Sequence, residues 1–196
     1  SRDAALDRAL ALFKEVGLPN PEARLRQFPH EISGGQRQRV LIALALACNP
    51  GLLIADEPTT ALDANVALRV TELLTDLSVR RQMSLLFISH DLAAVARATT
   101  EIVVMYGGTV VERGPTDQVL NAPRHPYTKG LLAARPRPEG LRQGGVRRRL
   151  PTIPGTVPPL DKLPPGCRFA GRCPVELPQC AATRPPGPAP RTRWSR

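Results

Sequence analysis

The sequence contains, at residues 52–63, the run Leu52-Leu53-Ile54-Ala55-Asp56-Glu57-Pro58-Thr59-Thr60-Ala61-Leu62-Asp63. Four apolar residues followed by two carboxylates predict a buried strand that presents both acids at its carboxyl edge, where Pro58 stops the strand. Ligands of open α/β sheets bind beyond the carboxyl ends of the strands. We therefore expect one acid to hold Mg²⁺ beside a nucleotide phosphate, and its neighbour to orient and deprotonate the attacking water. The plainer alternative is a core strand followed by an acidic turn.

A second motif, Ser33-Gly34-Gly35-Gln36, precedes a helical run over residues 37–47. Glycines let a phosphate approach backbone N–H groups closely, and the helix dipole places a partial positive charge there. This stretch therefore predicts an anion site at a helix N-terminus. The alternative is a capped helix after a turn, because Ser33 is a favourable N-cap residue.

The order of the following elements strengthens the first interpretation. Residues 63–81 predict a helix, and Ser84-Leu85-Leu86-Phe87-Ile88 predicts a second buried strand that ends in Ser89-His90. A histidine at that edge can donate a hydrogen bond to a γ-phosphate and help to fix the attacking water. A short helix over 92–98 follows, and then a hairpin over 102–112 whose Gly107-Gly108 turn supplies positive φ angles.

These motifs together resemble those of the ATP-binding cassette (ABC) ATPases. Ile32 to Gln36 resembles their signature motif, with Ile32 where Leu is commonest, and Leu52 to Glu57 resembles their Walker B strand. Ala61-Leu62-Asp63 resembles their D-loop, and His90 their switch histidine. The resemblance implies an α/β fold: the C-terminal portion of a P-loop, ABC-type nucleotide-binding domain, with a helical signature subdomain. The helix expected from Asp3 to Val16 resembles part of that subdomain.

Composition divides the chain near residue 130. The net charge is +10, but residues 1–130 hold 14 basic and 14 acidic residues, whereas 131–196 hold 13 basic and 3 acidic residues. Fourteen of the 22 prolines also follow residue 130. We therefore expect a partial ATPase domain over 1–130, a basic linker over 131–150 and a Pro/Arg-rich irregular extension over 151–196. No apolar run approaches the length of about 20 residues that crosses a bilayer.

The C-terminal part resembles one subfamily of importers. His125 to Leu132, Ile153 to Pro158 and Gly166 to Pro174 are similar to the segments that follow the ATPase domain in dipeptide, oligopeptide and nickel importers. The resemblance extends over about residues 33–180. Taken alone, residues 125–132 are a short helix started by a proline, in which His125 could be solvated. Arg147-Arg148-Arg149 could bind nucleic acid, but no aromatic residues interleave with these arginines, so attraction to anionic lipid head groups fits better.

Four cysteines occur, at 48, 167, 173 and 180. Cys48 ends an apolar helix and is expected to be buried. The subfamily resemblance implies a [4Fe–4S] cluster on Cys167, Cys173 and Cys180, although the fourth cysteine of that pattern is missing here. The alternative is free thiols.

No stretch of the chain matches Gly-x-x-x-x-Gly-Lys-Ser/Thr, the loop that wraps the β- and γ-phosphates. The family places that loop before the signature, so we expect this chain to be a fragment or a gene remnant that binds ATP negligibly by itself.

If the N-terminal half that carries this loop were restored, the resemblance implies the mechanism of an ABC importer. Two ATPase subunits would sandwich ATP, with Ser33, Gly34, Gly35 and Gln36 of one subunit facing the γ-phosphate held by the other. Asp56 would hold Mg²⁺, Glu57 would activate water, His90 would steady it and Asp63 would link the two sites. The partners implied are a second ATPase subunit, two transmembrane permeases and, indirectly, an extracytoplasmic solute-binding protein, at the cytoplasmic face of the inner membrane. Two alternatives stay open: a non-catalytic regulatory remnant, and a DNA-repair cassette ATPase, which the absence of heptads before Ser33 disfavours.

Overall fold

The computed structural model describes residues 1–135, 142–143, 146–147 and 150–183. Contacts divide the chain into two compact units, residues 1–99 and 100–196, and each unit is described by itself. Within the described residues, no helix is long and apolar enough to cross a membrane.

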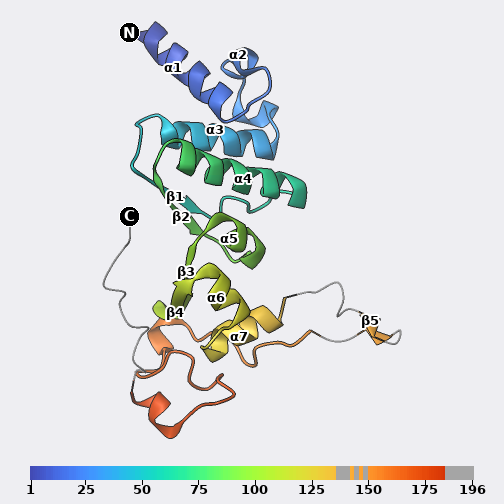
Figure 1. Ribbon diagram of the computed structural model, residues 1–196, viewed down its shortest axis with the longest axis vertical. Coiled ribbons are helices and arrows are strands. Elements are labelled where there is room, and N and C mark those ends of the chain that lie inside the picture. The colour runs from blue at the N-terminus through green and yellow to red at the C-terminus, as the bar shows by residue number, and fades with distance from the viewer. Residues whose placement is uncertain (136–141, 144–145, 148–149, 184–196) are drawn as a thin grey trace. The chain divides into compact units, whose positions relative to one another are not determined.

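The first unit begins with a layer of helices (Figure 1). These are α1 (Arg2–Glu15), α2 (Pro21–Arg24), the 3-10 turn η1 (Pro29–Glu31) and α3 (Gly34–Leu46). Ser1 caps α1, and Leu12 of α1 and Val16 just beyond it are buried. Helix α3 lies between α1 and α4 and contacts both of them. The predicted helices over 3–16 and 37–47 are therefore present, each shifted by one to three residues.

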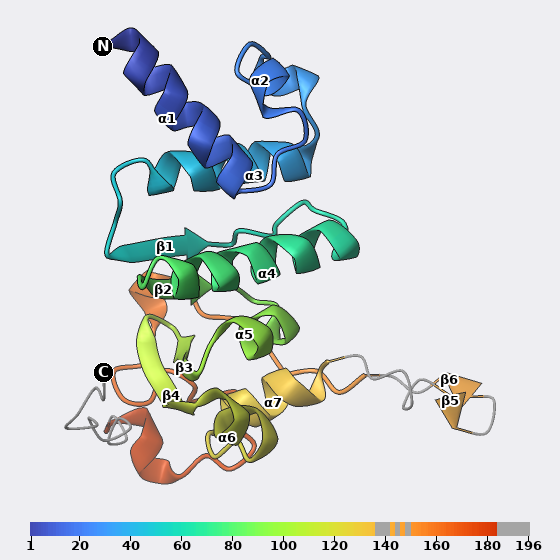
Figure 2. The same ribbon diagram turned by 45° about the horizontal axis from the view of Figure 1, so that its top comes forward.

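A two-stranded parallel sheet and two further helices complete the first unit (Figure 2). The elements are β1 (Leu52–Asp56), α4 (Ala64–Arg80), β2 (Ser84–Ile88) and α5 (Leu92–Ala98). Strands β1 and β2 pair in parallel from Leu52↔Ser84 to Asp56↔Ile88. Helix α4 buries Val70, Leu74 and Leu77, the inner face of its 3.6-residue repeat. A parallel crossover through a helix is the arrangement that the apolar pattern predicts.

Two burial predictions for this unit are wrong. Both strands were expected to be buried, but β1 alternates: Leu53 and Ala55 are buried, whereas Leu52 and Ile54 are exposed. Strand β2 likewise exposes part of its apolar side. In the described residues each strand is covered on one face, and a continuous apolar run does not reveal this. Cys48 is exposed because it lies in the turn after α3 ends, beyond the buried stripe of that helix.

The second unit is built on an antiparallel hairpin. Strand β3 (Glu101–Tyr106) pairs with β4 (Thr109–Pro115), and Gly107 and Gly108 at the turn have φ angles of 55° and 74°. Both values are positive, as a two-residue hairpin loop requires, so the predicted turn is present. The remaining elements are α6 (Thr116–Asn121), α7 (Pro126–Ala133), the short strands β5 (Arg142–Gln143) and β6 (Val146–Arg147), and the turns η3 (Leu160–Lys162) and η4 (Pro178–Ala181).

The core of the second unit joins the hairpin to the C-terminal segment. Tyr106 packs with Cys167, Phe169 and Ala170, and its ring centroid lies 5.2 Å from that of Phe169. The guanidinium of Arg172 donates to the Tyr106 hydroxyl at 2.8 Å and to the carbonyl oxygen of Pro154 at 2.7 Å. The extension predicted to be irregular therefore has few regular elements but does have a packed core. Much of the basic linker predicted at 131–150, including Arg148 and Arg149, lies outside the described residues.

Candidate functional site

The carboxyl ends of β1 and β2 meet at one edge of the parallel sheet. Asp56 pairs in register with Ile88, and the N–H of Glu57 donates to the carbonyl oxygen of Ile88 at 2.9 Å. Glu57 has a φ of 47°, in the left-handed region that few residues other than glycine adopt. The chain therefore turns sharply at Glu57, while a backbone hydrogen bond keeps this residue beside the end of β2.

This turn brings the Glu57 carboxylate to His90. Oε1 of Glu57 lies 2.8 Å from Nδ1 of His90 and accepts the backbone N–H of His90 at 3.2 Å. The hydrogen bond with Glu57, and then the negative charge of Glu57, raise the pKa of His90. The same hydrogen bond lowers the pKa of Glu57. The His90 side chain is 83% exposed and the Glu57 side chain is 37% exposed, so solvent can reach the pair.

Thr60 is part of this cluster, and our sequence interpretation missed it. Its hydroxyl donates to Oε2 of Glu57 at 3.0 Å. A hydroxyl residue three positions after the acid is the only sequence signal for this contact, and such a spacing is common in turns that have no function.

Asp56 lies at the last position of β1 and is exposed. Mg²⁺ in nucleotide sites is bound by one or two carboxylates, with phosphate oxygens and waters as its other ligands. A single exposed carboxylate at a strand end fits that requirement. Within the described residues, no group of three or more His, Cys, Asp or Glu side chains could hold a metal ion without such additional ligands.

The signature residues form the N-terminus of α3. Ser33 Oγ accepts the N–H of Gln36 at 3.3 Å, and Gln36 Oε1 accepts the N–H of Ser33 at 3.1 Å, which is a reciprocal capping box. A Cβ atom on Gly35 would lie 2.6 Å from Cγ1 of Val66, whereas one on Gly34 would lie 3.4 Å from Cδ2 of Leu62. Gly35 therefore has a packing reason to lack a side chain, because α3 approaches the start of α4 closely there.

Asp63 caps the helix that follows the acidic turn. Its Oδ1 accepts the N–H of Val66 at 3.0 Å, at the start of α4.

The predicted site residues form two separate hydrogen-bonded pairs: Ser33 bonds to Gln36, and Glu57 bonds to His90. Among the described residues, no hydrogen bond or ion pair links the first of these pairs to the second.

The three C-terminal cysteines lie around one apolar core but do not form a metal-binding group. Cys167 is buried, and its N–H donates to the carbonyl oxygen of Cys180 at 2.7 Å. Burial raises the pKa of the Cys173 thiol, which favours the protonated form over the thiolate that a metal requires. A [4Fe–4S] cluster takes four ligands, and three thiols do not supply them. The described residues thus give no support to the predicted cluster.

Two family models match this chain. Residues 2–60 match the ABC transporter family, and residues 111–180 match the C-terminal region of the oligopeptide/dipeptide transporters. Together the two matches cover more than half of the chain.

Several curated proteins are similar over most of this chain. A putative peptide import ATP-binding protein of Brucella melitensis is 48% identical over 190 residues, which are 95% of this chain and 55% of that protein. The dipeptide transport ATP-binding protein DppD of Escherichia coli is 48% identical over 91% of this chain and 53% of its own length. The oligopeptide transport ATP-binding protein OppD of Bacillus subtilis is 51% identical over 88% of this chain and 47% of its own length. The chain thus spans about half the length of the curated relatives it matches.

A solved structure shares the fold. The ATP-binding cassette MJ0796, in a dimeric post-hydrolysis state bound to ADP and Pi, matches with a TM-score of 0.51 and 32% identity. The match covers 59% of this chain and 49% of that one. The α/β, cassette-type fold predicted from the sequence is therefore confirmed.

Proposed function

We propose that this chain, which belongs to the ABC transporter family and carries the C-terminal region of the oligopeptide/dipeptide transporters, contributes the hydrolytic half of an ATPase that drives peptide import. The contact between Glu57 and His90 at the edge of the parallel sheet carries this proposal. A carboxylate in contact with an imidazole supports the proposal, because the first could accept a proton from a water and the second could donate a hydrogen bond to a phosphate. The relatives are named for peptides and dipeptides, which favours a peptide over nickel as the solute.

In the proposed reaction, water attacks the γ-phosphorus of ATP and the bond to the leaving ADP oxygen breaks. Glu57 accepts a proton from the attacking water, which gives ADP and inorganic phosphate. Nδ1 of His90 forms a hydrogen bond with Oε1 of Glu57. The other ring nitrogen, Nε2, would donate a hydrogen bond to the γ-phosphate. The raised pKa of His90 favours the imidazolium, in which both nitrogens donate.

The remaining predicted residues have supporting roles in this proposal. Asp56 would hold Mg²⁺, and that ion when bound supplies positive charge beside the phosphates. Ser33, Gly34, Gly35 and Gln36 would face the γ-phosphate held by a second ATPase subunit, because a helix N-terminus favours anions. Asp63 would connect the two sites across that interface. Closure and reopening of this ATPase dimer would drive two permeases from the cytoplasmic face of the membrane. A solute-binding protein would deliver the solute to these permeases.

No stretch of the 196 residues has the spacing of a phosphate-wrapping loop, so we expect this chain alone to bind ATP negligibly. Isothermal titration of the purified chain with Mg-ATP should give no measurable heat of binding. Micromolar affinity would contradict this part of the proposal.

Hydrolysis is tested by mixing the chain with a separately produced polypeptide that carries the phosphate loop of a relative, and measuring phosphate release. Glu57→Gln removes the proton acceptor and keeps the shape of the side chain, so the rate should fall by about 100-fold or more. The matched control is Glu72→Gln, the same exchange on the exposed side of α4, which should leave the rate unchanged. Hydrolysis by Glu57→Gln at the wild-type rate would rule out Glu57 as the general base.

A further inference from the structure

We infer that Thr60 is a positioning residue that holds the Glu57 carboxylate, so that Oε2 is the oxygen that accepts the proton of the attacking water. This inference rests on the proposed function, because it assigns an oxygen and a supporting side chain to the general base named there. Thr60 lies within the run of residues 52–63 that first indicated the site, but the sequence pattern indicates no role for it there.

Thr60 is fixed to Glu57 twice. Its backbone N–H donates to the carbonyl oxygen of Glu57 at 3.1 Å, which closes a turn of four residues. Its hydroxyl donates to Oε2 of the same residue at 3.0 Å. Pro58, inside this turn, has a fixed φ and so reduces the freedom of the turn. A threonine side chain is also restricted at χ1, so the hydroxyl has little freedom to leave the carboxylate.

The two oxygens of Glu57 are not equivalent. Oε1 faces two groups of His90, the backbone N–H at 3.2 Å and Nδ1 at 2.8 Å. Oε2 accepts one hydrogen bond, from Thr60. An ionised carboxylate oxygen has two lone-pair directions, so His90 fills both directions of Oε1, while one direction of Oε2 is left for a water. The hydrogen bond from Thr60 thus determines which lone-pair direction of Oε2 is left for the water.

The plainer account is that the Thr60 hydroxyl only stabilises its own turn, as Ser and Thr often do. The two accounts differ in what the hydroxyl does to Glu57. A turn-stabilising hydroxyl affects only the stability of the chain, whereas a positioning hydroxyl also affects kcat.

Thr60→Val tests the difference, because valine has nearly the same shape and lacks the hydroxyl. In the assembled ATPase described above, we expect kcat to fall about tenfold with KM for ATP unchanged, as expected for loss of one hydrogen bond to a charged group. Thr60→Ser keeps a hydroxyl and should recover most of the rate. Thr59→Val, the same exchange one residue earlier, should leave kcat unchanged. In a Glu57→Gln background, Thr60→Val should cause no further loss.

A second measurement needs no hydrolysis. In the isolated full chain labelled with ¹³C-glutamate, the Cδ resonance of Glu57 is identified by its loss in Glu57→Gln. At pH 8, Thr60→Val should shift this resonance and Thr60→Ser should leave it near the wild-type position. An unchanged resonance in Thr60→Val overturns the inference, and so does an unchanged kcat. If Glu57→Gln hydrolyses ATP normally, the proposed function fails instead, and that result is separate from the behaviour of Thr60.

Discussion

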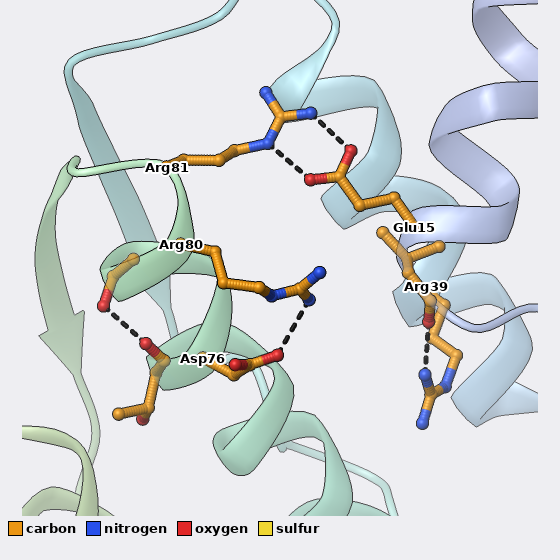
Figure 3. A network of polar contacts seen from close by, with 8 residues as sticks. Glu15, Arg39, Asp76, Arg80 and Arg81 are labelled. Carbon is orange, nitrogen blue, oxygen red and sulfur yellow. Dashed lines mark hydrogen bonds and ion pairs between the residues drawn. The ribbon is translucent and has the colours of Figure 1, made fainter.

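The guanidinium of Arg81, at the end of α4, binds both carboxylate oxygens of Glu15, at the end of α1 (Figure 3). Nε lies 2.7 Å from Oε1, and the terminal nitrogen lies 2.5 Å from Oε2. The two side chains are only 18% and 25% exposed. A third nitrogen of Arg81 donates to the side-chain oxygen of Asn49 at 3.2 Å. The pair thus joins the helical layer of the first unit to the helix that crosses between β1 and β2.

Replacing Glu15 with glutamine should destabilise the first unit. A half-buried arginine that loses a bidentate carboxylate retains its desolvation cost without the charge that offset it, so we expect a loss of about 2 kcal/mol. Urea unfolding followed by amide exchange in α1 and α4 would measure this. The control is Asp76→Asn, which removes the exposed pair of Asp76 and Arg80 within α4 and should cost less than about 0.5 kcal/mol. Equal losses in the two variants would contradict the special role of Glu15.

The same ion pair should make the stability of the first unit sensitive to acid. The hydrogen bond from Arg81 is the largest of the effects that lower the pKa of Glu15 below its ordinary value of 4.5. A carboxyl with a depressed folded-state pKa contributes stability above its unfolded pKa and loses that contribution as the pH falls through the folded value. The free-energy difference between wild type and Glu15→Gln should therefore be constant above about pH 5 and shrink below pH 4.5. A difference that stays constant to pH 3 would show that the charge of Glu15 is not what stabilises the unit.

Sequence patterns predicted the local elements well, because the interactions that form them are local. Helix α5 begins and ends at the predicted residues, and the Gly107-Gly108 turn is where the hairpin needed it. The meeting of Glu57 and His90 could also be anticipated, because the carboxyl ends of two parallel strands lie at one edge of a sheet. Long-range contacts left no comparable signal. Arg81 lies 66 residues from Glu15, and nothing in either neighbourhood indicates the partner.

The exposed face of β1 shows a second reason why the structure differs from the sequence prediction. Leu52 and Ile54 are as apolar as the buried Leu53, and a run without alternation predicts burial on both sides. Burial depends on what covers a residue, so it cannot be decided from the residue itself. The burial of Cys48 was misjudged for a related reason, because α3 ends at Leu46 and its buried stripe does not extend to Cys48.

The close approach of α3 to α4 predicts unequal tolerance of the two signature glycines. Alanine at position 35 would place its Cβ 2.6 Å from Cγ1 of Val66, so the helices must separate or Val66 must change its rotamer. We expect Gly35→Ala to cost about 1–3 kcal/mol, the usual cost of overpacking, although alanine favours the helix. Gly34→Ala meets only the end of the Leu62 side chain at 3.4 Å and should be nearly neutral.

The pair Gly35→Ala and Val66→Ala tests the cause. Because Val66→Ala removes the obstructing methyl groups, the double variant should be more stable than the sum of the two single losses predicts. Thermal unfolding of the four proteins gives this coupling energy directly. Strictly additive losses would mean that the glycine is required for some reason other than its distance from Val66.

The stability of the second unit should also fall in acid, but because a half-buried histidine takes up a proton rather than because an ion pair is lost. His125 caps α7 by accepting the N–H of Tyr127 on Nδ1 at 3.1 Å, so the sequence alternative of a solvated His125 is wrong in this respect. Burial is the main effect and lowers the pKa of His125 below 6.5, while the nearby Glu112 acts in the other direction. A neutral, half-buried imidazole accepts that hydrogen bond, whereas protonation at Nδ1 would abolish it.

A histidine with a depressed folded-state pKa binds its proton more readily when the chain is unfolded, so folding weakens as the pH falls below about 6.5. We expect the unfolding free energy of the second unit to decrease from pH 7.5 to pH 5, measured in urea by the ring resonances of Tyr106 and Tyr127. His125→Asn keeps a capping acceptor but cannot titrate, so its stability should be flatter over this range. If wild type and His125→Asn give parallel curves, the titration of another group must be responsible, and His125 would be a cap without a role in the pH response.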